Sequence, residues 1–125
     1  MPDTMPVSGL ITEANDLRLG IWIMPDNSSS GMLENFLHYL IPDTDQSLWN
    51  FAKSSVDTAK INSAPFRDVH LPKAEIHTWL AWQDPPGERF GIAITKKFLD
   101  PHSTSATAFV DWFKNLFGLN TLDLV

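Results

Sequence analysis

The sequence predicts an α/β fold that is mostly helical by mass, with a small mixed sheet packed by about four helices. A β-branched and aromatic run precedes Pro25, and later segments carry apolar residues at the three- and four-residue spacing of a helix. The chain has 125 residues, of which 43% are hydrophobic, enough for one domain with a sizeable core. We therefore expect a single domain over residues 1–125, ordered at about 9–118, with a loose leader and an apolar tail.

Two segments before Pro25 are predicted to be strands that pair as a hairpin. Residues 9–13 fit a short strand, and residues 14–16, Ala-Asn-Asp, have turn chemistry. Residues 17–24 follow, and their second half suits a strand that is buried on both faces. Pro25 ends this strand because proline has no N–H to give the ladder. Two strands alone make a poor sheet, so we expect further strands in the connectors, a larger sheet, or completion by a partner.

Four later segments are predicted to be helices with one apolar face, and one further segment is ambiguous. The four helices span about residues 31–41, 45–61, 72–83 and 105–117. In the third helix we expect Ile76, Trp79 and Leu80 to be buried. Residues 91–99 fit both a strand and a helix, and we favour a short helix. Pro42 and Gly118 mark helix ends.

Composition restricts the class of function. The chain has no cysteine, which excludes disulfides and zinc sites of the cysteine-rich kind. Its net charge of −6 makes nucleic-acid binding through a basic face unlikely. Arg89, Lys96 and Lys97 surround one loop and fit either a small anion patch or a solvated surface. No apolar run reaches the ~20 residues of a membrane helix and no signal peptide is present, so we expect a cytoplasmic protein.

A first group of polar residues follows the predicted second strand. Asp26 and Asn27 come directly after it, and Glu34 lies at the start of the next helix. Carboxylate and amide oxygens suit Mg²⁺, which takes one or two carboxylates and keeps several waters. Free N–H groups at the helix start suit an anion. We therefore expect Asp26 and Glu34 as metal ligands and Asn27 as a ligand-binding residue. The alternative is that Asp26 and the neighbouring serines satisfy turn and helix-start backbone groups.

A second group lies at the start of the predicted third helix. Lys73 and His77 are four residues apart and share one helix face. A lysine near a helix start fits a phosphate contact, and His77 fits an acid or base near neutral pH. We therefore expect Lys73 and His77 to bind phosphate. The alternative is that these residues, with His70 and Glu75, are ordinary surface residues.

Several of these segments resemble a known family. The run from Leu19 to Asn27, followed by Gly31-Met32-Leu33-Glu34, resembles a bacterial family of unknown function with a TOPRIM-like fold, similar to the nuclease domain of OLD-type proteins. Weaker likenesses occur at residues 73–74, 79–81, 91–93 and 109–113. The resemblance covers about residues 9–117 and corresponds to the C-terminal portion of such a protein, as a natural short form or a fragment.

The resemblance implies one function and the missing motifs suggest another. TOPRIM domains bind Mg²⁺ with a glutamate after the first strand and an Asp-x-Asp after a later one, and this chain lacks those acids. Asp43-Thr44-Asp45 matches the Asp-x-Asp pattern but is predicted to lie between two helices. One expectation is therefore Mg²⁺-dependent phosphodiester or nucleotide handling. The alternatives are a non-catalytic interaction domain, as a homodimer or with a partner that completes the sheet, and a ligand-binding module without turnover.

Overall fold

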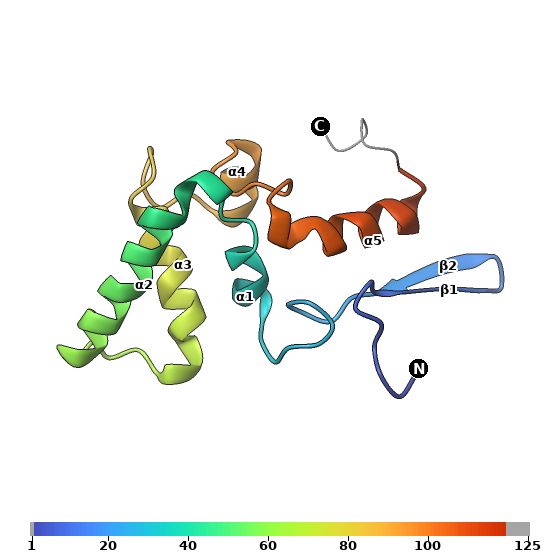
Figure 1. Ribbon diagram of the computed structural model, residues 1–125, viewed down its shortest axis with the longest axis horizontal. Helices are drawn as coiled ribbons and strands as arrows, with labels where there is room; N and C mark the ends of the chain where they lie inside the picture. The colour runs from blue at the N-terminus through green and yellow to red at the C-terminus, as the bar shows by residue number, and fades with distance from the viewer. Residues whose placement is uncertain (1, 120–125) are drawn as a thin grey trace.

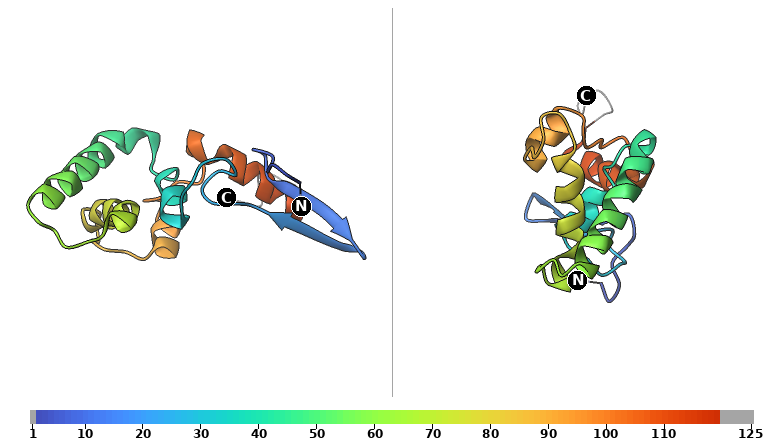
Figure 2. Two further views of the ribbon diagram at one scale, coloured as in Figure 1. Left: turned by 90° about the horizontal axis from the view of Figure 1, so that it is seen from below. Right: turned by 90° about the vertical axis from the view of Figure 1, so that its left-hand side faces the viewer.

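The computed structural model describes residues 2–119 as an elongated α/β molecule that is about half helical (Figure 1). Its elements are β1 (Leu10–Ala14), β2 (Leu17–Ile21), α1 (Leu33–His38), α2 (Gln46–Ile61), α3 (Leu71–Ala81), α4 (Phe90–Thr95) and α5 (Thr107–Phe117). Short 3₁₀ turns precede α2, α3 and α5 at Asp43–Asp45, Asp68–His70 and Thr104–Ala106. The hairpin and α5 form one end of the molecule, and α2 and α3 form the other (Figure 2).

The predicted hairpin is confirmed, and it is joined by a two-residue turn. Ala14 pairs with Leu17, so Asn15 and Asp16 form the turn, and their φ values of 53° and 64° are those of a type I′ turn. In the described part of the chain the sheet is antiparallel, so the expected mixed sheet is wrong. The second strand ends at Ile21, before the predicted Met24.

One face of the hairpin packs on α5. An ideal Cβ on Gly20 would lie 2.5 Å from Leu116 Cδ2 and 2.9 Å from Trp112 Cζ2, and one on Gly9 would lie 2.3 Å from Trp112 Cδ1. The Trp112 indole also donates a hydrogen bond to the carbonyl of Leu10 at 3.1 Å. Glycine is therefore required where the two layers approach most closely.

The opposite face of the hairpin is left open. Side chains of a strand alternate between its two faces. Gly20 and its partner Ile11 therefore face α5, as does the next pair but one, and the pairs between them point away. Leu17 is 71% exposed and Leu19 is 56% exposed. No described element covers this face. The prediction that the second half of the strand is buried on both faces is wrong, because β2 ends at Ile21 and Ile23 beyond it is 45% exposed.

The main core lies between α1, α2 and α3 and extends to α4 and the start of α5. Ile76, Trp79 and Leu80 are at most 1% exposed, which confirms their predicted burial. The Trp79 indole donates to Asp45 Oδ2 at 3.0 Å, so the largest of the fully buried side chains has its polar atom satisfied. Phe36 of α1 contacts Phe109 of α5 at 4.6 Å between ring centroids, which joins the core to the hairpin end.

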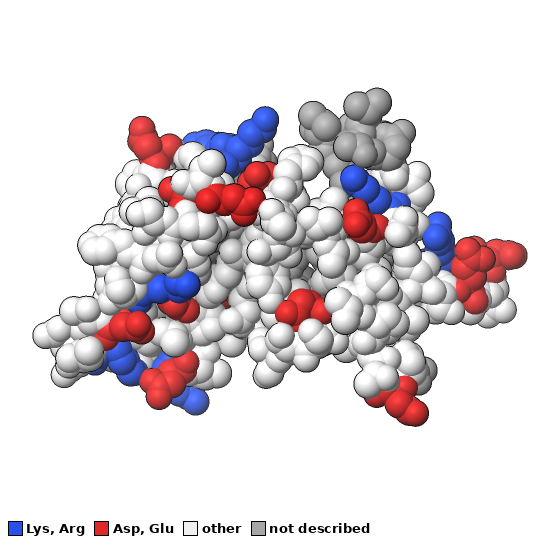
Figure 3. Space-filling view, in the orientation of Figure 1, with Lys and Arg blue, Asp and Glu red and all other residues white. Residues whose placement is uncertain are grey.

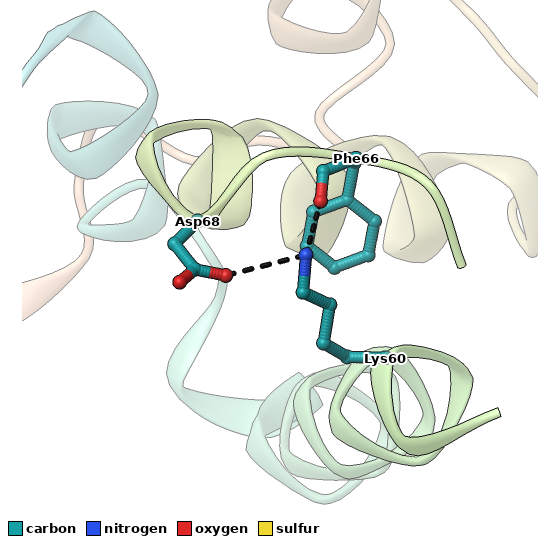
Figure 4. A network of polar contacts seen from close by, with 3 residues as sticks. All are labelled: Lys60, Phe66 and Asp68. Atoms are coloured by element: carbon teal, nitrogen blue, oxygen red, sulfur yellow. Dashed lines mark hydrogen bonds and ion pairs between the residues drawn. The ribbon is translucent and has the colours of Figure 1, made fainter. Parts of the chain in front are cut away.

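A polar clamp closes the connection between α2 and α3 (Figure 4). The Lys60 ammonium lies 4.6 Å from the centre of the Phe66 ring and 3.2 Å from Asp68 Oδ1, and it also donates to the carbonyl of Phe66. The connection between the two helices includes the 3₁₀ turn at Asp68–His70.

Several helix bounds differ from those predicted. The first helix is shorter than 31–41, because Met32 is extended with φ −132° and ψ −175°. At its other end, Leu40 and Ile41 are buried in a turn, since Pro42 disfavours a helical residue before it. Residues 91–99 contain α4, so the preference for a short helix is confirmed and there are five described helices. The apolar end of the predicted tail, at 120–125, lies outside the described residues.

Within residues 2–119, no helix combines the length and the apolar character that a membrane crossing needs.

Candidate functional site

Asp26 lies at the centre of a hydrogen-bonded loop between β2 and α1. Its carboxylate accepts bonds from the backbone N–H groups of Ser28 and Ser29 at 3.1 and 2.7 Å and from both serine hydroxyls at 3.1 and 3.0 Å. The hydroxyl of Tyr39 donates a fifth bond at 2.8 Å. The Ser29 N–H, followed by the Tyr39 hydroxyl, holds the pKa of Asp26 well below its usual range. Burial, together with the Asp26 carboxylate, raises the pKa of Tyr39 to about 12.

Asn27 ties the leader to the end of the hairpin. Its side-chain oxygen accepts from the N–H of Ile23 at 2.7 Å, and its amide donates to the carbonyl of Val7 at 3.2 Å. The residue is 8% exposed and has a φ of 64°. The chain's own backbone therefore occupies the amide that was expected to bind a ligand.

Glu34 lies in the first turn of α1, one turn before His38. His38 Nε2 lies 3.1 Å from the carbonyl oxygen of Pro72, and its ring packs against Trp49 at 4.6 Å between centroids. Burial lowers the pKa of His38, although the charge of Glu34 acts in the opposite direction. In residues 2–119, no three His, Cys, Asp or Glu side chains gather as a metal ion would require, so an ion at Asp26 or Glu34 would take most ligands from water.

Lys73 and His77 lie on α3, and both are exposed. The His77 ring lies 5.3 Å from that of Phe90 at the start of α4. The contact of His38 with Pro72 brings α1 against the start of α3, so Glu34 and Lys73 belong to helices that touch. Beside them, burial raises the pKa of Glu75, with Lys53 acting against that shift.

A groove that the sequence did not predict lies beside α4. It has a volume of about 570 Å³. Its lining residues are Pro42, Thr44, Ile94, Thr95, Lys97, Asp100, Pro101 and His102. An apolar hollow of about 190 Å³ adjoins it and shares Pro101 and His102. The remaining lining residues of the hollow are Phe109, Val110 and Phe113 of α5. Pro101 lies in the sequence between two segments with helical periodicity, and this proline could have indicated a bend in the chain at the groove.

Charges are interspersed on the face of the molecule shown in Figure 3. Basic side chains gather over α4 and at the free end of α2 and α3, and acidic side chains lie beside each group. This face therefore offers no broad basic surface for a polyanion.

Comparisons with known proteins give one match. No curated protein and no solved structure matches the chain at a significant level. A family model described as "Protein of unknown function (DUF3226)" matches residues 1–118. This match covers nearly the whole sequence, and the chain belongs to the DUF3226 family of proteins of unknown function.

Proposed function

We propose that this chain is a non-catalytic interaction domain that forms a homodimer through the open face of its hairpin. The outer leucine face consists of Leu10, Thr12, Ala14, Leu17, Leu19 and Ile21. It carries no charged side chain, and two of its leucines are more than half exposed. This uncovered apolar face is the observation that carries the proposal, because a contiguous exposed apolar surface marks a site of protein interaction.

A second copy is the occupant that fits the face best. A two-fold interface needs a patch that is complementary to itself, and a row of uncharged, mostly aliphatic side chains meets this condition. Each molecule carries a net charge of −6, so a charged face would repel its copy. On the hairpin, Glu13 and Arg18 lie on the α5 side and pair at 3.9 Å, which leaves the outer face neutral.

The test is the oligomeric state of the wild type and of Leu17→Lys with Leu19→Lys, by sedimentation equilibrium. We expect a wild-type dimer, and a double variant that dissociates with at least a ~100-fold weaker association, because each leucine loses roughly 1.5–3 kcal/mol of burial in the interface. The matched control is Ile61→Lys with Val69→Lys, which places the same charges on exposed aliphatic positions at the other end of the molecule. A monomeric wild type, or dissociation of the control, contradicts the proposal.

A second proposal rests on the TOPRIM-like resemblance: Mg²⁺-dependent phosphodiester or nucleotide handling. Asp26 and Glu34 would hold the ion, with Lys73 and His77 toward the phosphate, while the Asn27 amide stays bonded to the backbone of Ile23 and Val7. The low pKa of Asp26 favours Mg²⁺ binding, because a hard cation requires an ionised carboxylate. Bound there, Mg²⁺ would supply Lewis-acid polarisation of a phosphoryl oxygen.

Calorimetry with Mg²⁺ tests this second proposal. The expected result is saturable binding that Asp26→Ala with Glu34→Ala abolishes while the circular dichroism spectrum is retained. Asp57→Ala with Asp111→Ala removes two exposed acids from the helices α2 and α5 and should leave binding intact. If the wild type binds no Mg²⁺, Asp26 is a turn residue, as its five hydrogen bonds within the chain favour.

A further inference from the structure

The groove beside α4 is held in shape by three hydrogen bonds between its two walls. The Asp100 N–H donates to the carbonyl of Leu40 at 2.6 Å. The Ser103 hydroxyl donates to the carbonyl of Tyr39, and the Thr104 hydroxyl donates to Asp43 Oδ2 at 3.0 Å. These bonds join the segment before α2 to the segment between α4 and α5, which lie side by side in Figure 1. The groove is therefore preformed, as binding sites for small molecules usually are.

Two opposite charges line this groove without pairing with each other. Within residues 2–119, neither Lys97 nor Asp100 forms an ion pair, so their charges lie more than 4.0 Å apart. One oxygen of Asp100 accepts the N–H of His102 at 2.8 Å, and no described side chain bonds to its second oxygen. By contrast, the neighbouring Lys96 pairs with Glu88 at 2.8 Å. A ligand that carries both a negative and a positive group would satisfy both sides of the groove.

Lys97 occupies a backbone position that suits glycine better. It follows the end of α4 with a φ of 62°, in the left-handed region that side chains with a Cβ disfavour. Glycine is the usual residue at this position after a helix. This left-handed residue ends α4, and Lys97 lines the groove at that point.

The apolar hollow beyond His102 provides the third element of recognition. Phe109, Val110 and Phe113 line it, and it opens beside Pro101 and His102, which it shares with the groove. A short apolar group attached to a charged head in the groove would reach this hollow and lose its exposure to water there.

We propose that the groove binds a free α-amino acid with an apolar side chain. Lys97 contacts the carboxylate, Asp100 contacts the ammonium group, and the side chain enters the hollow lined by Phe109, Val110 and Phe113. The groove lies away from the outer leucine face, so this proposal is independent of dimerisation. Either proposal is open to rejection without the other.

The test uses L-phenylalanine and analogues that each lack one feature, with calorimetry on the full chain. We expect L-phenylalanine to bind with a Kd below about 1 mM. Phenethylamine lacks the carboxylate, 3-phenylpropionate lacks the amine and glycine lacks the side chain, so each should bind at least ~10-fold more weakly. The doubly blocked N-acetyl-phenylalaninamide should not bind, which separates a free amino acid from a residue within a peptide.

Two variants assign the contacts to their residues. Lys97→Gly should weaken the binding of L-phenylalanine and of 3-phenylpropionate at least ~10-fold and leave the binding of phenethylamine unchanged. It should keep or raise the midpoint of thermal unfolding, because glycine accepts the left-handed backbone conformation. Asp100→Asn keeps an oxygen that accepts the His102 N–H. It should weaken the binding of L-phenylalanine and of phenethylamine and leave the binding of 3-phenylpropionate unchanged. Lys96→Ala removes the same charge one residue earlier and should leave all affinities unchanged.

Three results overturn the proposal. The first is no saturable binding of L-phenylalanine or L-leucine up to about 10 mM. The second is binding that Lys97→Gly does not weaken, and the third is equal binding of the blocked amide.

Discussion

Trp79→Ala is expected to lower the free energy of unfolding by about 3–5 kcal/mol, the largest loss of any single substitution that we propose. Trp79 is fully buried on α3 and packs in the core between α1, α2 and α4. Its removal leaves a cavity and also leaves Asp45 without the indole N–H that it accepts at 3.0 Å. Urea denaturation followed by far-ultraviolet circular dichroism measures the loss, and a domain of this size has only about 5–15 kcal/mol in total.

Trp82→Ala is the matched control, one turn further along the same segment. Trp82 is 41% exposed and stacks on the exposed Phe51 at 5.4 Å between ring centroids. Its loss should therefore cost no more than about 1.5 kcal/mol, the value of an aromatic pair. Trp79→Phe keeps most of the buried area and separates the cost of the lost hydrogen bond. Equal losses for Trp79→Ala and Trp82→Ala would contradict the core described above.

Asn27→Ala is expected to destabilise the chain by about 3 kcal/mol, the second largest loss. Two backbone groups, the N–H of Ile23 and the carbonyl of Val7, lose their partner, and each costs roughly 1–3 kcal/mol where water does not replace it. Alanine is also disfavoured at a φ of 64° by roughly 1 kcal/mol. Hydrogen exchange should show the effect most strongly at the Ile23 amide, and urea denaturation gives its size.

Asn27→Gly separates the two causes. Glycine accepts the left-handed backbone but lacks the amide, so it should recover about 1 kcal/mol of the loss and leave the exchange at Ile23 fast. If alanine and glycine cost the same, the backbone conformation contributes nothing. If neither destabilises the chain, the amide does not hold the leader to the hairpin.

The parts of the fold that the sequence predicted are those set by local chemistry. The Ala-Asn-Asp turn and the hairpin, the α3 stripe with Trp79, and Gly118 after α5 follow from neighbouring residues alone. The sequence misjudged the exposure of β2, because an apolar strand looks the same whether one or two of its faces are covered. It also extended the first helix too far, since Leu40 and Ile41 keep helical spacing while buried in a turn.

The candidate site was predicted only where its contacts are close in the sequence. The serines after Asp26 suggested a turn, and Ser28 and Ser29 do bond to its carboxylate. The Tyr39 hydroxyl lies thirteen residues further on, and no spacing rule points to it. The groove was missed for the same reason, because its walls join residues 39–43 to residues 100–104.

Gly9, directly before β1, and Gly20 of β2 lie at the same end of the hairpin, away from its turn, and both lie against the indole of Trp112. A methyl group at either position would require the indole to move, so these three positions constrain one another. Relatives with a larger residue at position 9 or 20 should carry a smaller one than tryptophan at position 112. Covariation among these three positions would then record, in an alignment of the family, how closely α5 lies on the hairpin.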